Sequence, residues 1–181
     1  MTPDSGVDAG PGASGEVDPG VAPAPRAVVV TVSDGVMAGT RDDASGDVVE
    51  ARLAALGYAV ERHVVADEPG DISQVVAVAA DSGARLVITT GGTGLGPRDR
   101  TPEAVEGVIE YVVPGFGEAM RAEGRTHTPL ASLSRSLGGV RGQSLVLCLP
   151  GSPRGASESL DAVADILEHA LRMLAGRTAH G

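Results

Sequence analysis

The sequence lacks lysine: all fourteen of its basic residues are arginines. Without a lysine amine, Schiff-base chemistry, pyridoxal-phosphate attachment, a lysine-containing phosphate loop and a kinase-type active site are excluded. Cys148 is the single cysteine, which excludes disulfide frameworks, cysteine-based zinc sites and cysteine-held iron–sulfur clusters. The four histidines show no metal-ligand spacing, and there is no G-x-S-x-G nucleophile elbow. Few groups are left for covalent catalysis.

Aromatic residues are also scarce, since Tyr58, Tyr111 and Phe116 are the only ones. Single-stranded nucleic acid is bound by stacking bases on aromatic side chains, and a formal net charge of −10 repels polyanions and acidic membranes. We therefore expect neither nucleic acid nor a membrane as a partner.

Residues 1–25 have neither the basic start nor the hydrophobic run of a signal peptide, and no later segment is apolar enough to span a bilayer. The sequence therefore predicts a cytoplasmic protein.

The chain length of 181 residues, with 42% hydrophobic content, predicts one globular domain with a core of Val, Leu, Ile and Ala. We place this domain at residues 26–176. Residues 1–25 are rich in Gly, Pro, Ala and acids and lack apolar periodicity, so they are predicted to be a disordered tail. Residues 177–181 are predicted to be a short C-terminal tail.

The charges are unevenly distributed along the chain. Seven arginines and six acids lie in residues 97–154, against seven arginines and eighteen acids elsewhere, which favours a small anionic ligand for this segment.

The strongest local pattern covers residues 84–104. An apolar run at residues 86–88 predicts a strand buried on both faces. Four glycines follow within residues 91–96, and Thr101 and Pro102 then predict a helix with Thr101 as its N-cap. A strand, a glycine loop and a helix start in this order place free backbone N–H groups at the carboxyl edge of a sheet, where they can hold phosphate.

Arg98, Asp99 and Arg100 stand between this loop and the helix. Two cations beside one carboxylate suit a phosphorylated ligand that arrives with a divalent metal. The alternative is a glycine turn without a ligand, because such turns occur throughout α/β proteins. The loop is not a Walker A motif, which needs a lysine.

The remaining chain repeats the alternation of strand, loop and helix. Residues 27–32 predict a buried strand, which leads into a polar loop and a helix capped by Ser45. Residues 58–66 predict a strand near a sheet edge, and Asp71 is expected to cap the helix that follows it.

The second half of the chain begins with a short helix predicted at residues 114–121. A last buried strand from Gln143 runs to Leu149, and Ser152 caps a long helix with an apolar stripe. This second helix start at a strand end is another candidate anion site. The alternation predicts an α/β fold with a mainly parallel sheet, helices on both faces and function at the carboxyl ends of the strands.

Five ordered segments together resemble a known family, the molybdopterin adenylyltransferases of molybdenum-cofactor biosynthesis (the Mog/MoaB type), related to the G domain of gephyrin. The segments are VSDGVMAGTRDDASG (32–46), TTGGTGLGPRDRTPEA (89–104), PGFGEAMR (114–121), LSR (133–135) and LPGSP (149–153). The resemblance runs from about Arg26 to Gly176. It implies a three-layer αβα, molybdopterin-binding-like domain that assembles as a homotrimer, or in some members as a hexamer.

The activity that this resemblance implies is transfer of AMP from Mg-ATP to the terminal phosphate of molybdopterin, with release of pyrophosphate. Adenylylated molybdopterin would then be handed over to a molybdenum-insertion protein. Such transfer needs positioning and charge neutralisation more than a protein nucleophile, which agrees with the shortage of nucleophiles.

The resemblance also assigns residues. It makes Asp67 and Asp99 catalytic, with Asp99 holding Mg²⁺, although spacing alone favours Asp67 as a turn residue. It implies contacts with the substrates ATP and molybdopterin from Ser33, Asp34, Thr90, Gly91, Gly92, Thr93, Gly94, Ser134, Arg135, Pro150, Gly151 and Ser152. Cys148 stands where relatives often have Asn, and Arg100 where an aliphatic residue is common, which affects fine specificity.

Two alternatives remain open at this point. One is a molybdopterin-binding protein of the same fold without adenylyl-transfer turnover, and the other is a regulatory or scaffolding module. Both Asp67 and Asp99 are present, which favours the enzyme.

Overall fold

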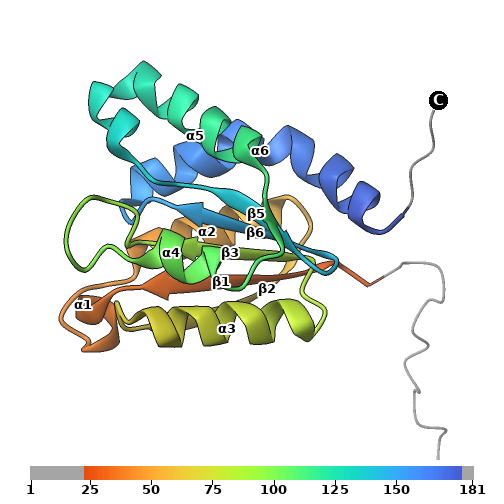
Figure 1. The fold of residues 1–181 in the computed structure, drawn as a ribbon, viewed down its shortest axis with the longest axis horizontal. Coiled ribbons are helices and arrows are strands. Elements are labelled where there is room, and N and C mark those ends of the chain that lie inside the picture. The colour runs from red at the N-terminus through yellow and green to blue at the C-terminus, as the bar shows by residue number, and fades with distance from the viewer. Residues whose placement is uncertain (1–22, 177–181) are drawn as a thin grey trace, which may run out of the picture.

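The computed structural model describes residues 23–176, in which a six-stranded sheet lies between two layers of helices (Figure 1). The strands follow the spatial order β2-β1-β3-β6-β5-β4. The first four run parallel, and β5 and β4 add an antiparallel edge. Their bounds are β1 (Arg26–Val32), β2 (Ala59–Val65), β3 (Leu86–Thr90), β4 (Tyr111–Val112), β5 (Gly138–Arg141) and β6 (Ser144–Leu149).

The helices divide between the two faces of the sheet (Figure 1). Helices α2, α5 and α6 pack on one face, and α3 and α4 pack on the other. The bounds are α1 (Asp34–Met37), α2 (Ala44–Ala55), α3 (Pro69–Asp81), α4 (Thr101–Glu106), α5 (Pro114–His127), the 3₁₀ helix η1 (Pro129–Leu133) and α6 (Pro153–Leu174). Among the described residues, no helix combines the length and apolar character needed to cross a bilayer.

Strand β1 shows why apolar runs without polar alternation form the centre of this sheet. Ala27 and Val29 pack towards α2 and α6, whereas Val28 and Val30 pack towards α3. All four are at most 1% exposed. Because successive side chains of a strand point to opposite faces, a strand covered by helices on both sides needs apolar residues at every position.

The predicted α/β class with a mainly parallel sheet is confirmed, and so is the position of the second strand at an edge. The predicted tails at residues 1–25 and 177–181 lie outside the described residues, apart from residues 23–25.

Three predicted helix caps were wrong. Helix α2 is capped by Asp43, whose side chain accepts a hydrogen bond from Gly46 N, while Ser45 is buried within the first turn. Glu68 occupies the N-cap position of α3 because Pro69 takes the first helical position, which leaves Asp71 in the first turn. Arg100 precedes α4, so Thr101 is its first residue.

The antiparallel edge was not predicted. Strand β4 has only two residues, and β5 begins with Gly138 and Gly139, which normally weaken a strand. A Cβ on Gly138 would lie 2.6 Å from the Cβ of Phe116, so the glycine lets α5 pack closely on the sheet. Helix α5 also extends beyond its predicted end, to His127.

Asp43 connects α2 to the sheet and carries our first stability prediction. Its Oδ1 accepts from Gly46 N at 2.9 Å and its Oδ2 accepts from the Thr31 hydroxyl at 2.8 Å and pairs with Arg62. We expect Asp43→Ala to lower the free energy of unfolding by about 2 kcal/mol, because the cap and two part-buried hydrogen bonds are lost. Asp43→Asn, which keeps an acceptor for Gly46, should lose less. Urea denaturation measures both, and equal stability of Asp43→Ala and the unaltered protein would contradict the prediction.

Cys148 lies in the middle of the sheet on β6 and is fully buried. Burial raises the pKa of its thiol to about 12. The thiolate is the reactive form, so at pH 8 the folded protein should react with Ellman's reagent at least about a hundredfold more slowly than the urea-unfolded chain. As the single cysteine, it reports on opening of the core directly. Rapid labelling of the folded protein at pH 8 would contradict the burial.

Candidate functional site

Four parallel strands end at the same edge of the sheet, and the turn after each of them carries a predicted site residue. These are Asp67 after β2, Ser33 after β1, Gly91 after β3 and Gly151 after β6. Backbone hydrogen bonds join neighbouring turns: Ser33 N donates to Val65 O at 3.0 Å, and Gly91 N donates to Leu149 O at 3.1 Å. The carboxyl edge therefore brings together residues that are far apart in sequence.

A cavity of about 670 Å³ opens at this edge, which we call the carboxylate cavity. It is lined by Thr31, Val32, Ser33, Val36, Arg41, Asp42, Ala44, Ser45, Asp67, Thr90, Gly91, Gly92, Asp99, Gly151, Ser152 and Pro153. Both predicted catalytic residues, Asp67 and Asp99, are among them. Arg41 and Asp42 line it too, although sequence reasoning did not single them out within the polar loop after β1.

The loop after β3 depends on glycine for its shape. Gly91 has φ +107°, and a Cβ there would lie 2.3 Å from Val32 O. Gly92 has φ +64°, and a Cβ there would lie 2.2 Å from the Thr101 hydroxyl oxygen. Any side chain at either position would thus disrupt the contact of the loop with β1 or α4.

This loop leaves backbone donors open. Gly91 N is used by Leu149 O, but among residues 23–176 the N–H groups of residues 92–94 have no hydrogen-bond acceptor. Successive backbone N–H groups without acceptors at the end of a strand are donors that an anion can use. The predicted phosphate loop therefore has backbone donors that other residues of the described chain do not use.

Each of the two catalytic candidates has one oxygen held and one oxygen open. Asp99 Oδ2 accepts from Gly96 N at 2.8 Å, and Asp67 Oδ2 accepts from Asp34 N at 2.9 Å. Asp67 N in turn donates to Asp34 Oδ1 at 3.1 Å, so two hydrogen bonds hold the turn after β2 against the turn after β1. The Oδ1 atoms of Asp67 and Asp99 have no hydrogen-bond partner among the described residues.

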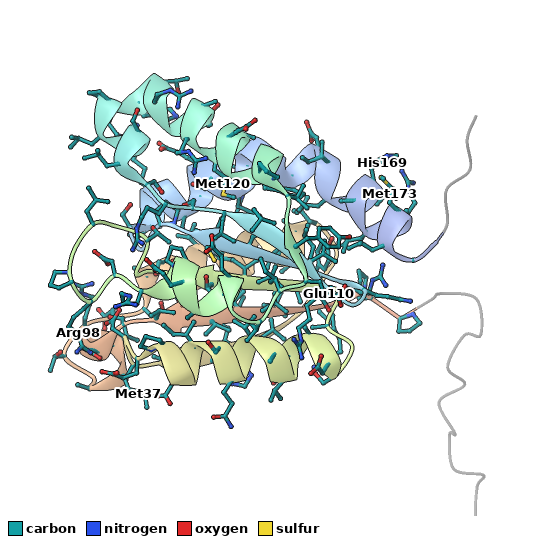
Figure 2. The ribbon with its side chains drawn as sticks, viewed as in Figure 1. Met37, Arg98, Glu110, Met120, His169 and Met173 are labelled. Atoms are coloured by element: carbon teal, nitrogen blue, oxygen red, sulfur yellow. The ribbon has the colours of Figure 1, made fainter. Side chains whose placement is uncertain are left out.

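Two arginines hold the glycine loop in place. Arg98 lies beside α1 at the carboxyl edge (Figure 2), with its Nη2 2.7 Å from Asp34 Oδ2 and 3.2 Å from Glu68 Oε1. Asp34 first, and then Glu68, raise the pKa of Arg98. Arg135 donates from Nε to Gly94 O at 2.8 Å and from its terminal nitrogens to Asp99 O and Glu103.

A second cavity of about 490 Å³ adjoins the first, and we call it the α5–α6 cavity. It shares Gly151 and Ser152 with the carboxylate cavity and also contains Thr93, Gly94, Ser134 and Pro150 among the predicted residues. Its lining includes three exposed leucines, Leu95, Leu130 and Leu133.

The predicted ligand contacts therefore separate into groups. Ser33, Thr90, Gly91 and Gly92 line the carboxylate cavity, although the Thr90 hydroxyl donates to Pro150 O at 2.9 Å. Asp34 and Arg135 line neither cavity and instead hold neighbouring turns through the contacts described above.

Asp67 and Asp99 are the predicted carboxylates that could hold a magnesium ion in the carboxylate cavity. Among the described residues, no group of three or more His, Cys, Asp or Glu side chains could hold a metal by itself. Mg²⁺ usually binds through one or two carboxylates plus substrate phosphates and water, and each of the carboxylates of Asp67 and Asp99, which line one cavity, has an open oxygen of the kind that such an ion prefers.

The chain is similar in sequence to proteins of one known family. Residues 28–169 match the family model described as "Probable molybdopterin binding domain". A molybdopterin adenylyltransferase of Helicobacter pylori is 37% identical over 82% of this chain and 86% of its own length. A molybdenum cofactor biosynthesis bifunctional protein of Synechococcus elongatus is 43% identical over 83% of this chain, which spans about half (47%) of that relative.

The fold is likewise similar to solved structures. The molybdopterin biosynthesis enzyme MoaB of Thermus thermophilus superposes with a TM-score of 0.77 at 46% sequence identity, covering 83% of this chain and 96% of that protein.

Proposed function

The chain belongs to the family of probable molybdopterin binding domains, and on this premise we propose that it is a molybdopterin adenylyltransferase of molybdenum-cofactor biosynthesis. It transfers AMP from ATP to molybdopterin and releases pyrophosphate. The observation that carries the proposal is the row of N–H groups at residues 92–94, which have no acceptor within residues 23–176. Gly92 lines the carboxylate cavity with Asp67 and Asp99, and Thr93 and Gly94 line the adjoining α5–α6 cavity.

Two adjoining cavities suit a reaction of two substrates whose phosphates must meet. An oxygen of the terminal phosphate of molybdopterin attacks the α-phosphorus of ATP, and the bond from that phosphorus to the bridging oxygen of pyrophosphate breaks. The N–H groups of residues 92–94 and the N-terminus of α6, capped by Ser152, would stabilise the charge that develops on the phosphate oxygens. The shared turn at Gly151 and Ser152 is where the two substrates would come into contact.

Asp99, together with Asp67, would hold Mg²⁺, which when bound neutralises charge on the phosphates. The positions of both carboxylates are set in advance by backbone N–H donors from Gly96 and Asp34. Ser33, in the carboxylate cavity, and Ser134, in the α5–α6 cavity, are proposed as substrate contacts.

The family resemblance extends the proposal to assembly and cellular context. We propose a cytoplasmic homotrimer, or a hexamer, that hands its product to a molybdenum-insertion protein. Sedimentation at working concentration tests the assembly, and a monomer would contradict it.

Pyrophosphate release tests the proposed reaction. The purified protein, ATP, magnesium and molybdopterin should yield pyrophosphate and adenylylated molybdopterin in equal amounts, and omitting molybdopterin should abolish both. Binding of both substrates without either product would contradict the enzyme and favour the molybdopterin-binding alternative.

A further inference from the structure

The arginines near the carboxylate cavity differ in whether their side chains are free. Arg98 is paired with Asp34 and Glu68, Arg135 with loop carbonyls and Glu103, and Arg62 with the acids around α2. These guanidinium groups already have partners in the protein. A ligand phosphate that approached them would have to displace existing contacts.

Arg41 is different. Among residues 23–176, only the guanidinium groups of Arg41, Arg100 and Arg125 have no hydrogen-bond or ion-pair partner. Of these three, Arg41 alone lines the carboxylate cavity. The cavity thus has one arginine in its wall, and that arginine is available for a ligand.

The backbone beneath Arg41 is fixed although its side chain is exposed. Thr40 N and Arg41 N both donate to Gly35 O, at 2.9 and 3.1 Å, and the Thr40 hydroxyl donates to the same oxygen at 3.0 Å. On the other side, Asp43 is held by Gly46 N and the Thr31 hydroxyl. Arg41 therefore projects from a fixed turn at the cavity wall.

The carboxylates of the cavity wall make a cation beside them favourable for binding a phosphate. Asp42, Asp67 and Asp99 line the same space, so an incoming polyphosphate meets three carboxylates. A guanidinium group presents paired donors that match two phosphate oxygens and remains charged at any working pH. Together with a divalent ion at the carboxylates, it would offset the repulsion.

We infer that Arg41 binds a phosphate group of a substrate in the carboxylate cavity. The inference rests on the proposed function for the identity of the ligand, and it deepens that function by naming a residue that the glycine-loop motif does not contain. The phosphate comes either from the triphosphate of ATP or from the terminal phosphate of molybdopterin. Both are phosphate groups with free oxygens, and the experiment separates them.

Calorimetric titration of the unaltered protein and of Arg41→Gln with Mg-ATP, and separately with molybdopterin, tests the inference. We expect Arg41→Gln to bind one of these ligands about tenfold more weakly, as expected for the loss of a charge-assisted hydrogen bond. Weaker binding of Mg-ATP identifies the triphosphate as the ligand group, and weaker binding of molybdopterin identifies its phosphate. Arg41→Lys, which keeps the charge but not the paired donors, should give an intermediate affinity.

The matched control is Arg125→Gln, which removes an equally unpartnered, exposed arginine on α5 outside both cavities. It should bind both ligands like the unaltered protein. Affinities of Arg41→Gln within twofold of the unaltered protein for both ligands would overturn the inference, and so would equal losses in the control. If the unaltered protein binds both ligands but forms no product, the proposed function fails while the role of Arg41 is still decided by the titrations.

Discussion

Asp99→Asn is expected to lower the rate of adenylyl transfer by about 100- to 1,000-fold while the melting temperature stays nearly unchanged. The asparagine oxygen can still accept the hydrogen bond from Gly96 N, so the loop keeps its conformation. The substitution removes the negative charge that a divalent ion needs. Steady-state kinetics with varied magnesium, together with thermal unfolding, measures both parts of the prediction.

The control for this variant is Asp71→Asn, which neutralises another acid near the start of a helix. Asp71 lies in the first turn of α3 and lines neither cavity of the site. The Asp71→Asn variant should transfer AMP at the same rate as the unaltered protein. Turnover of Asp99→Asn close to that of the unaltered protein would remove Asp99 from the mechanism.

Arg135→Gln is expected to lower kcat by about a hundredfold, with a smaller change in the affinity for ATP. Arg135 holds the glycine loop at Gly94 O and Asp99 O and also pairs with Glu103. A displacement of reacting groups by about 1 Å can cost about a hundredfold in rate, even when the altered residue does not touch the substrate. Single-turnover kinetics and nucleotide titration separate the two quantities.

The comparison with Arg172→Gln controls for the loss of an arginine ion pair. Arg172 pairs with Glu168 one turn earlier on the exposed face of α6, far from the glycine loop in sequence and outside both cavities. That variant should retain its kcat. If Arg135→Gln instead binds substrate weakly but turns it over at a normal rate, Arg135 is a ligand contact, as the family resemblance implied, and does not position the loop.

Much of the fold could be predicted because the buried strands have local signals. Runs such as residues 27–32 and 86–88 are apolar at every position, and this pattern is typical of strands covered on both faces. Strands β4 and β5 have no such signal. Their pairing places Val112 opposite Gly139, where a Cβ would lie 2.8 Å from Tyr111 O, and α5 packs on β5 because Gly138 fits against Phe116. Periodicity reveals neither contact, because the residues lie far apart in the sequence.

The site could be predicted in part for a similar reason. The glycine loop and Asp99 lie within one short motif, so sequence and resemblance together identify them. The contacts that hold them are long-range: Arg135 reaches Gly94 across 41 positions, and Asp67 reaches Asp34 across 33. Arg41 lies within the segment of residues 32–46 that resembles the family, but the resemblance assigns it no role, and only the three-dimensional arrangement distinguishes it from the other arginines.

The central claim is that the loop after β3 binds the phosphates of a nucleotide at the carboxyl edge of the sheet. A crystal structure of the protein soaked with magnesium and a non-hydrolysable ATP analogue tests it directly. We expect phosphate oxygens within hydrogen-bond distance of the N–H groups of residues 92–94, with a divalent ion at Asp99. A nucleotide bound elsewhere, with this edge occupied only by water, would contradict it.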